Sequence, residues 1–199
     1  MTKNQLDRIK LFSKRFYKYA GEYHGWDHIL LTRESALWLA KYFKKIDLRV
    51  LEASVYLHDI GRSVKDEGHP KISIKLAQPF LKKIGLTKIE INKIEDAVLN
   101  HNKDKILQAK TKEAKILFDA DKLQILTLYG FVRVLLWLVE ERKMRMDKAV
   151  NFLWKYIKDV RKNYLQTKYA KRVVDREMPT INKVVDAYIA HLKCDNLNF

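Results

Sequence analysis

The residues with the clearest chemical potential are the adjacent pair His58 and Asp59, in the segment VYLHDIGR at 55–62. The flanking side chains are mostly apolar, so both polar groups are expected in a low-dielectric setting where each needs a partner. A divalent metal ion is such a partner, because it accepts nitrogen and oxygen ligands together. An HD dipeptide alone is more often a helix-terminal histidine beside a surface aspartate, so the rest of the chain must decide between these readings.

Further histidines and aspartates surround this pair in an ordered series. Besides His58 and Asp59, the series comprises His24, His28, His69, His101, Asp119 and Asp121. Asp119 and Asp121 are two residues apart, so on a helix their side chains point about 200° from one another. Only one of them should reach a common ion easily, and their spacing does not decide which. His24 is expected beside the site or on the surface.

The order of these residues resembles the H…HD…D pattern of the HD-domain metal-dependent phosphohydrolase superfamily. The segment DADKLQILTLYGFVR is similar to the DADRLDA…GI.R segment of small soluble bacterial and archaeal members, and the resemblance covers about residues 20–135. It implies one divalent ion, which could be manganese, nickel, iron, cobalt, magnesium or zinc. The implied ligands of this ion are His28, His58, Asp59 and Asp121. Asp119 is left with a supporting role.

The resemblance also places His69 and His101 at the active site, where they bind a second metal or the substrate phosphate. Dinuclear members usually carry two consecutive histidines at the later position, whereas here Asn102 follows His101. We therefore favour one ion, leaving room for a second, with His69 and His101 as phosphate-side or acid–base groups. Histidine titrates near neutral pH, so either one could protonate a leaving oxygen.

The reaction implied is hydrolysis of a phosphate ester or anhydride, by a phosphomonoesterase, phosphodiesterase or nucleotide pyrophosphohydrolase. The ion would lower the pKa of a water molecule and polarise the phosphorus, and Asp59 could orient the nucleophile. Arg62, Lys65 and Lys122 are candidates for offsetting charge on the phosphate, although exposed positions are the default for such residues. A nucleotide or another small phosphorylated metabolite is the expected substrate, by family analogy.

Apolar residues at helical spacing run along the whole chain, and no strand pattern is found. The expected helices are 4–20, one starting near 28, 48–60, 69 up to Gly85, 87–101, one starting near 111, 131–140, 147–169 and 173–192. The fold class is therefore all-α, and the resemblance implies a single-domain helical bundle of the HD-domain or phosphodiesterase-like type over residues 1–199. Its core would span about 20–135, with the helices of 136–199 completing the bundle.

Local residue types predict several helix ends. Asp27 and Asp47 are expected N-caps, because a short carboxylate side chain accepts free backbone N–H groups. Gly21 and Gly61 are expected to stop helices, the latter in the left-handed conformation. The polar segment 62–68 is expected to form a mobile loop at the mouth of the site.

The formal net charge of +16 attracts anions in general, including nucleic acid, nucleotides and phosphate esters. No RNP motif, zinc-finger spacing or glycine-rich phosphate loop accompanies this charge, and lysine-rich solvated helix faces are the favoured explanation of it. Aromatic and basic residues alternate over 147–169, which could form a nucleic-acid face. Aromatic residues at helical spacing are nevertheless more often part of a core.

Composition favours a cytoplasmic globular protein. The only cysteine, Cys194, excludes an internal disulfide, and residues 1–10 lack the apolar run of a secretory signal. The longest apolar stretch, 123–139, is interrupted by Gln124 and Arg133 and is shorter than the ~20 residues that span a bilayer. Oligomeric state is left as monomer or homodimer. Two alternatives to the enzyme stay open: a metal-stabilised non-catalytic module that senses a ligand, and a basic nucleic-acid-binding helical protein.

Overall fold

The computed structural model describes residues 1–19 and 22–192, so Gly21 and Cys194 lie outside the described residues. Within these two ranges all regular elements are helices, which confirms the all-α prediction. The α-helices are α1 (Lys3–Tyr17), α2 (Trp26–Ala40), α3 (Leu48–Leu57), α4 (His69–Lys83), α5 (Lys88–Leu99), α6 (Lys112–Leu126), α7 (Leu128–Glu140), α8 (Met146–Asn163) and α9 (Lys168–Leu192).

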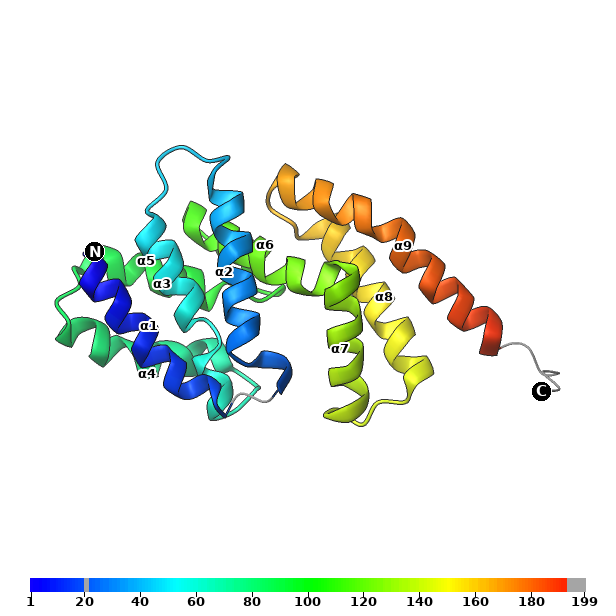
Figure 1. The fold of residues 1–199 in the computed structure, drawn as a ribbon. Coiled ribbons are helices and arrows are strands. Elements are labelled where there is room, and N and C mark those ends of the chain that lie inside the picture. Colours follow the sequence, from blue (N-terminus) through cyan, green and yellow to red (C-terminus); the bar gives the residue numbers. More distant parts are fainter. Residues whose placement is uncertain (20–21, 193–199) are drawn as a thin grey trace.

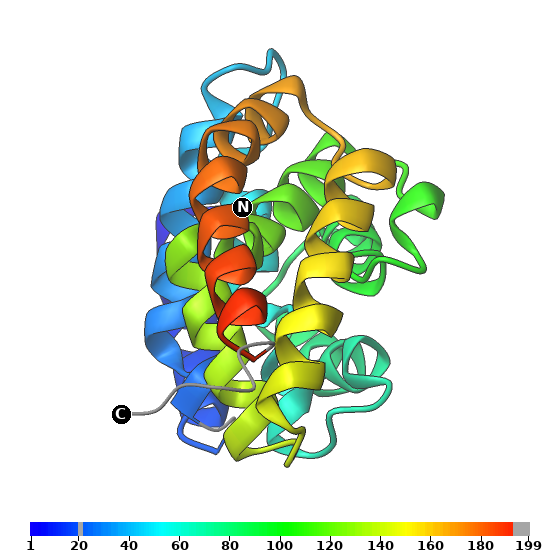
Figure 2. The ribbon, with the colours of Figure 1, turned by 90° about the vertical axis from the view of Figure 1, so that its right-hand side faces the viewer.

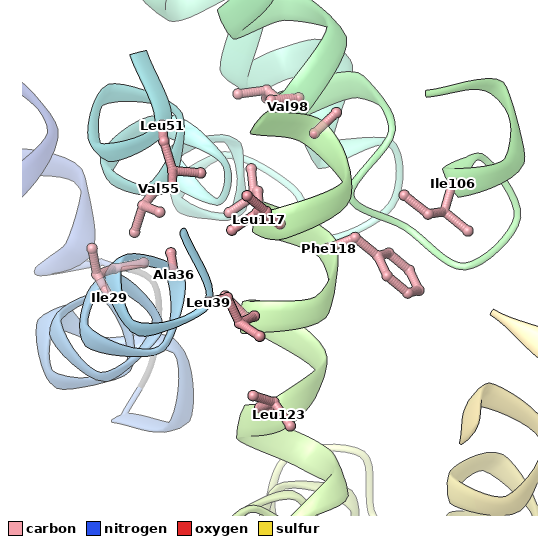
Figure 3. Packing of buried hydrophobic residues seen from close by; sticks show 14 of the residues in the cluster. Ile29, Ala36, Leu39, Leu51, Val55, Val98, Ile106, Leu117, Phe118 and Leu123 are labelled. Carbon is pink, nitrogen blue, oxygen red and sulfur yellow. The ribbon is translucent and has the colours of Figure 1, made fainter. Parts of the chain in front are cut away.

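Helix α6 occupies the centre of the molecule, with α2 packed along it (Figure 1). Its apolar side chains point in several directions and are buried all round, which is typical of a core helix rather than a surface one. In Figure 3, Leu117 of α6 lies among buried side chains from α2, α3 and α5, while Phe118 points towards Ile106. Helix α6 therefore forms the centre of the core, and α2, α3, α5, α7, α8 and α9 all pack against it.

The remaining helices lie on two sides of this central pair. Helices α1, α3, α4 and α5 gather at one end of the molecule, and α7, α8 and α9 gather at the other (Figure 1). Helices α8 and α9 run beside each other in both views, with α7 against them (Figure 2). The HD dipeptide follows α3 and so belongs to the first group of helices, whereas α7 and α8 belong to the second group.

A 76° bend separates α6 from α7. The Thr127 side chain caps α7 by accepting a hydrogen bond from the Gly130 N–H at 3.3 Å. A Cβ atom on Gly130 would lie 2.2 Å from the Gln124 carbonyl oxygen, so only glycine fits this corner. Arg133 donates to the same Gln124 oxygen at 2.9 Å, which ties the first turns of α7 to the end of α6.

Among the described residues, no single helix is long and apolar enough to cross a membrane; α6 and α7 meet the length and composition criteria only when counted together across their bend.

Helix starts with strong local caps agree with the sequence. Asp47 accepts from the backbone N–H groups of Arg49 and Val50, and Thr87 forms a reciprocal capping box with Glu90. The predicted cap at Asp27 is wrong, because α2 begins at Trp26 and Asp27 lies in its first turn. A carboxylate in the first turn is still stabilised by the positive end of the helix dipole.

Three predicted helix ends are also wrong. Helix α1 ends at Tyr17, and Tyr19, expected on its buried stripe, is 76% exposed. Helix α3 ends at Leu57, and Gly61 does not adopt the left-handed conformation expected of it. The C-terminal helices predicted over 147–169 and 173–192 are instead α8 and α9, separated by a break at 164–167.

Candidate metal centre

The end of α3 fixes the orientation of the His58 ring. The His58 Nδ1–H donates to the Val55 carbonyl oxygen at 2.8 Å, so Nε2 carries the lone pair of the neutral ring. Ser73 of α4 donates its hydroxyl to the His58 carbonyl oxygen at 2.9 Å and accepts from the Gly61 N–H at 2.8 Å. The turn that holds the HD pair is therefore fastened to α4, and His58 presents a nitrogen lone pair to the interior.

Four residues expected as metal ligands lie together, and we call them the first donor set. The set consists of His28, His58, Asp59 and Asp121. His28 Nε2 is 3.3 Å from Asp121 Oδ1, and His58 Nε2 is 3.8 Å from the same oxygen. His58 Nε2 is also 3.6 Å from Asp59 Oδ2. All four residues are buried, and His28, His58 and Asp59 each offer a ligand atom within 4.8 Å of the others.

His69 and His101 form a second donor set with Asp59, on the other side of its carboxylate. Their Nε2 atoms lie 3.0 and 3.4 Å from Asp59 Oδ1 and 3.0 Å from one another. Each ring donates its Nδ1–H to a backbone carbonyl oxygen, that of Asp66 at 2.8 Å and that of Val98 at 2.6 Å. Two Nε2 lone pairs therefore face each other, an arrangement that is favourable only around a proton or a cation.

The two sets fit a divalent cation. Among the described residues, the buried His58 Nε2 and Asp59 Oδ1 atoms have no hydrogen-bond partner, which would be costly unless another ligand satisfied them. Metal-binding histidines usually donate their second ring N–H to a carbonyl or a carboxylate, as His58, His69 and His101 do here.

The protonation states also suit metal binding. Burial by itself raises the pKa of Asp59, but the Arg62 guanidinium and His58 outweigh it and hold that pKa well below its usual range. Burial likewise opposes ionisation of Asp121, whose pKa is held low chiefly by Lys122 and His28. Burial lowers the pKa of His101 to about 4, against the opposing effect of Asp59. Ionised carboxylates and a neutral imidazole are the forms that ligate metals.

The three basic residues expected at the substrate phosphate occupy different environments. The Arg62 Nε–H donates to Asp59 Oδ2 at 2.8 Å, and a second Arg62 nitrogen donates to Asp66. Lys122 is buried with its ammonium 2.6 Å from Asp121 Oδ2. Lys65 pairs with Glu67 at 3.1 Å on the exposed surface and does not line the cavity beside the donor sets. The structure thus brings Arg62 and Lys122 to the site, and it leaves Lys65 outside.

A cavity of about 230 Å³ adjoins the first donor set. Its charged floor comes from the HD region and includes His28, Asp59, Arg62, Asp121 and Lys122. Its opposite side comes from α7 and α8 and includes Trp137, Phe152 and Tyr156. A larger groove of about 990 Å³ between α4, α5 and residues 102–111 contains none of the donor residues, so the smaller cavity is the functional candidate.

Sequence reasoning missed the contribution of α7 and α8 to this cavity. The aromatic residues of 147–169 were expected in a core or on a nucleic-acid face, and Trp154 and Tyr164 do pack against the core. Tyr156 packs against the core as well and also lines the cavity, whereas Phe152 lines the cavity and is half exposed. His24, whose place the sequence left open, lines the cavity too, with its ring centroid 6.0 Å from that of His28. No short sequence pattern predicts that α7 and α8 line the cavity, because their position depends on the bend between α6 and α7.

Asp119 points away from the donor sets and holds the break between α8 and α9. Its two carboxylate oxygens accept the backbone N–H groups of Gln166 at 2.8 Å and Thr167 at 2.7 Å. Thr167 in turn caps α9 by accepting from the Ala170 N–H at 3.1 Å. Burial raises the pKa of Asp119 to about 6, although these hydrogen bonds oppose the shift. The Asp119 carboxylate therefore satisfies backbone N–H groups between α8 and α9, although it lies 47 residues earlier in the chain than Gln166.

Replacing Asp119 with alanine is expected to lower the free energy of unfolding by about 2–4 kcal/mol, because one buried and one partly buried N–H lose their acceptor. Urea denaturation at pH 7.5 measures the change. Asp104 is exposed, and Asp104→Ala should stay within about 0.5 kcal/mol of the parent. Equal effects of the two substitutions would show that the Asp119 hydrogen bonds contribute nothing to stability.

Comparisons with known proteins agree with this fold. The family model of the HD domain matches residues 25–126 of the 199-residue chain, a segment that contains both donor sets. No curated protein sequence matches this chain.

Solved structures share the fold at low sequence identity. A protein of Lactobacillus plantarum has a TM-score of 0.81 at 19% identity, over 98% of this chain and 100% of that one. Bacillus subtilis YpgQ in complex with ADP has a TM-score of 0.73 at 18% identity, over 98% and 96% of the two chains. A protein from an uncultured Thermotogales bacterium, described as a predicted HD superfamily hydrolase, has a TM-score of 0.65 at 18% identity, over 94% and 92%. With more than half of its length matched by the family model, this chain belongs to the HD-domain family.

Proposed function

We propose that this protein is a metal-dependent phosphohydrolase that cleaves a phosphate ester or anhydride of a small phosphorylated metabolite, with nucleotides as the first class to test. Membership of the HD family and the hydrolase description of one relative support a metal-dependent hydrolase in general terms. ADP bound to the Bacillus subtilis protein of the same fold supports a nucleotide. The observation that carries the proposal is the buried, ionised Asp59 set between two groups of histidine nitrogens.

The first donor set would hold the ion, which would polarise the phosphoryl group and lower the pKa of a water molecule. Asp59 Oδ1, which has no hydrogen-bond partner among the described residues, would orient that water. The Nε2 atoms of His69 and His101 can take up a proton and return it to the leaving oxygen. If these two histidines and Asp59 bind a second ion instead, the acid–base role passes to another group, so metal stoichiometry tests this assignment.

Arg62 and Lys122 would stabilise the negative charge that develops on the phosphate. Arg62 uses its Nε and one terminal nitrogen for Asp59 and Asp66, and a guanidinium has five N–H donors. Lys122 gives one of its three N–H donors to Asp121. Each residue therefore keeps donors for a phosphate while its carboxylate partner holds it in position.

The decisive experiment is phosphate or pyrophosphate release from a panel of nucleotides and phosphomonoesters. Protein stripped of metal is compared with protein reloaded with manganese, nickel, cobalt or magnesium. Release that requires metal, at about one ion per chain or two, is the expected result. Metal binding without release from any compound would favour the ligand-sensing module, and DNA or RNA binding that survives metal removal and weakens with salt would favour the nucleic-acid-binding alternative.

A further inference from the structure

The cavity beside the first donor set has a charged side and an aromatic side that come from different parts of the chain. We call Trp137, Phe152 and Tyr156 the aromatic wall. Trp137 belongs to α7 and the other two belong to α8, so all three lie outside the 25–126 segment matched by the HD family. The match to the HD family model therefore carries no information about the aromatic wall.

The rings of the aromatic wall are held in place, yet one of them is left uncovered. The Phe152 and Tyr156 rings lie 6.4 Å apart between centroids and only 25° from parallel. Trp137 contacts the Arg142 guanidinium, 4.7 Å from its ring centroid, and the edge of the His24 ring at 5.4 Å. Phe152 nevertheless remains 52% exposed. An aromatic ring that is exposed beside a cavity gains free energy when a flat apolar group covers it.

Few hydrogen-bonding groups accompany the aromatic wall. Away from the charged floor, the polar side chains lining the cavity are those of His24, Asn102, Arg133 and Tyr156, and Trp137 has an indole N–H. The His24 ring packs against the rings of His28 and Trp137. Arg133 donates to the carbonyl oxygens of Tyr23 and Gln124, which engages its terminal nitrogens. Recognition of one particular base requires several polar groups matched to its edge, whereas stacking on a ring is available to every base.

We propose that the aromatic wall determines specificity: the substrate carries a planar aromatic group, a nucleobase, that stacks on Phe152 and Tyr156 while its phosphate lies at the charged floor. The wall selects for the presence of a flat ring and only weakly for which base it is. This inference rests on the proposed phosphohydrolase function. It identifies the non-reacting part of the substrate as a nucleobase.

Binding to metal-free protein in a chelator tests the wall without any chemistry. By titration calorimetry, AMP and CMP should bind within about fivefold of each other, and ribose 5-phosphate about ten- to a hundredfold more weakly. Phe152→Ala should remove about tenfold of the affinity for both nucleotides and leave ribose 5-phosphate unchanged. Phe152→Tyr, which keeps a ring, should restore it. Equal affinities for AMP and ribose 5-phosphate, or no measurable binding of either, would overturn the proposal.

A matched control comes from the same group of helices. Tyr129 of α7 is 58% exposed and lines another hollow, which shares Arg133 with the cavity but contains no residue of either donor set. Tyr129→Ala should leave the affinities for all three ligands as they are, and an effect equal to that of Phe152→Ala would count against the aromatic wall. Phosphate release without any preference for substrates with a ring would contradict the stacking proposal but not the proposed phosphohydrolase function. Binding that depends on the ring, without phosphate release, would contradict the proposed function but not the stacking site.

Discussion

Replacing Asp59 with asparagine is expected to lower metal-dependent phosphate release by at least about a hundredfold and to weaken metal binding similarly. Asp59 is the only residue shared by both donor sets, so the substitution removes an anionic ligand from each. Asparagine keeps the shape of the side chain but not its charge. The Arg62 guanidinium then loses the carboxylate that holds it 2.8 Å away.

Both effects are measurable on one preparation, by phosphate release and by calorimetric titration of manganese into stripped protein. Asp104→Asn provides the control, because it removes one exposed carboxylate that belongs to neither donor set and does not line the cavity beside them, so it should change neither quantity. An Asp59→Asn variant that kept the parental metal affinity and activity would show that Asp59 is not part of a functional metal site.

Replacing Gly61 with alanine is expected to lower the free energy of unfolding by about 3 kcal/mol or more and to disturb metal binding as well. A Cβ atom there would lie 2.2 Å from the His69 carbonyl oxygen and 2.8 Å from the Ser73 nitrogen. Both atoms are backbone atoms of α4, which cannot swing aside as the end of a flexible side chain can. Relief requires a shift of α4, and α4 carries His69.

Gly68→Ala is the control that distinguishes steric overlap, expected at Gly61, from the cost of a left-handed backbone conformation. Gly68 has a φ of 72° and nothing within 4 Å of an added Cβ, so alanine there should cost only about 1–2 kcal/mol. Urea denaturation and manganese titration of both variants give the comparison. If the two substitutions destabilise equally, close packing against α4 is not what requires glycine at position 61.

Features encoded over a few residues were predictable from the sequence. Asp47, Thr87 and Thr111 each bring their own acceptor oxygen to the helix that follows, so local chemistry decides where those helices begin. The assembly of the first donor set followed from a family resemblance carried by ordered histidines and aspartates. The choice of Asp121 over Asp119 also needed that resemblance, and the opposite directions of the two side chains agree with it.

Features that depend on distant parts of the chain were not predictable. Asp119 accepts two backbone N–H groups at the break at 164–167. Thr167 is a local cap for α9, but nothing near residue 165 in the sequence signals the contact with the distant Asp119 carboxylate. Gly61 was read as a helix stop, whereas the structure uses its lack of a side chain to bring α4 close. The place of Phe152 depends on the bend after α6, and the same helical spacing would serve an ordinary core residue.

The division of one cavity between two stretches of chain bears on how such a protein can diversify. The charged floor lies within 25–126, and the aromatic wall belongs to α7 and α8. If the aromatic wall acts as proposed, substitutions at Trp137, Phe152 and Tyr156 would alter which molecules are accepted without replacing any residue of the donor sets. Grafting the α7–α8 hairpin between relatives would exchange preferences without rebuilding the reactive groups, and Thr127 and Gly130 mark the corner at which such an exchange should begin.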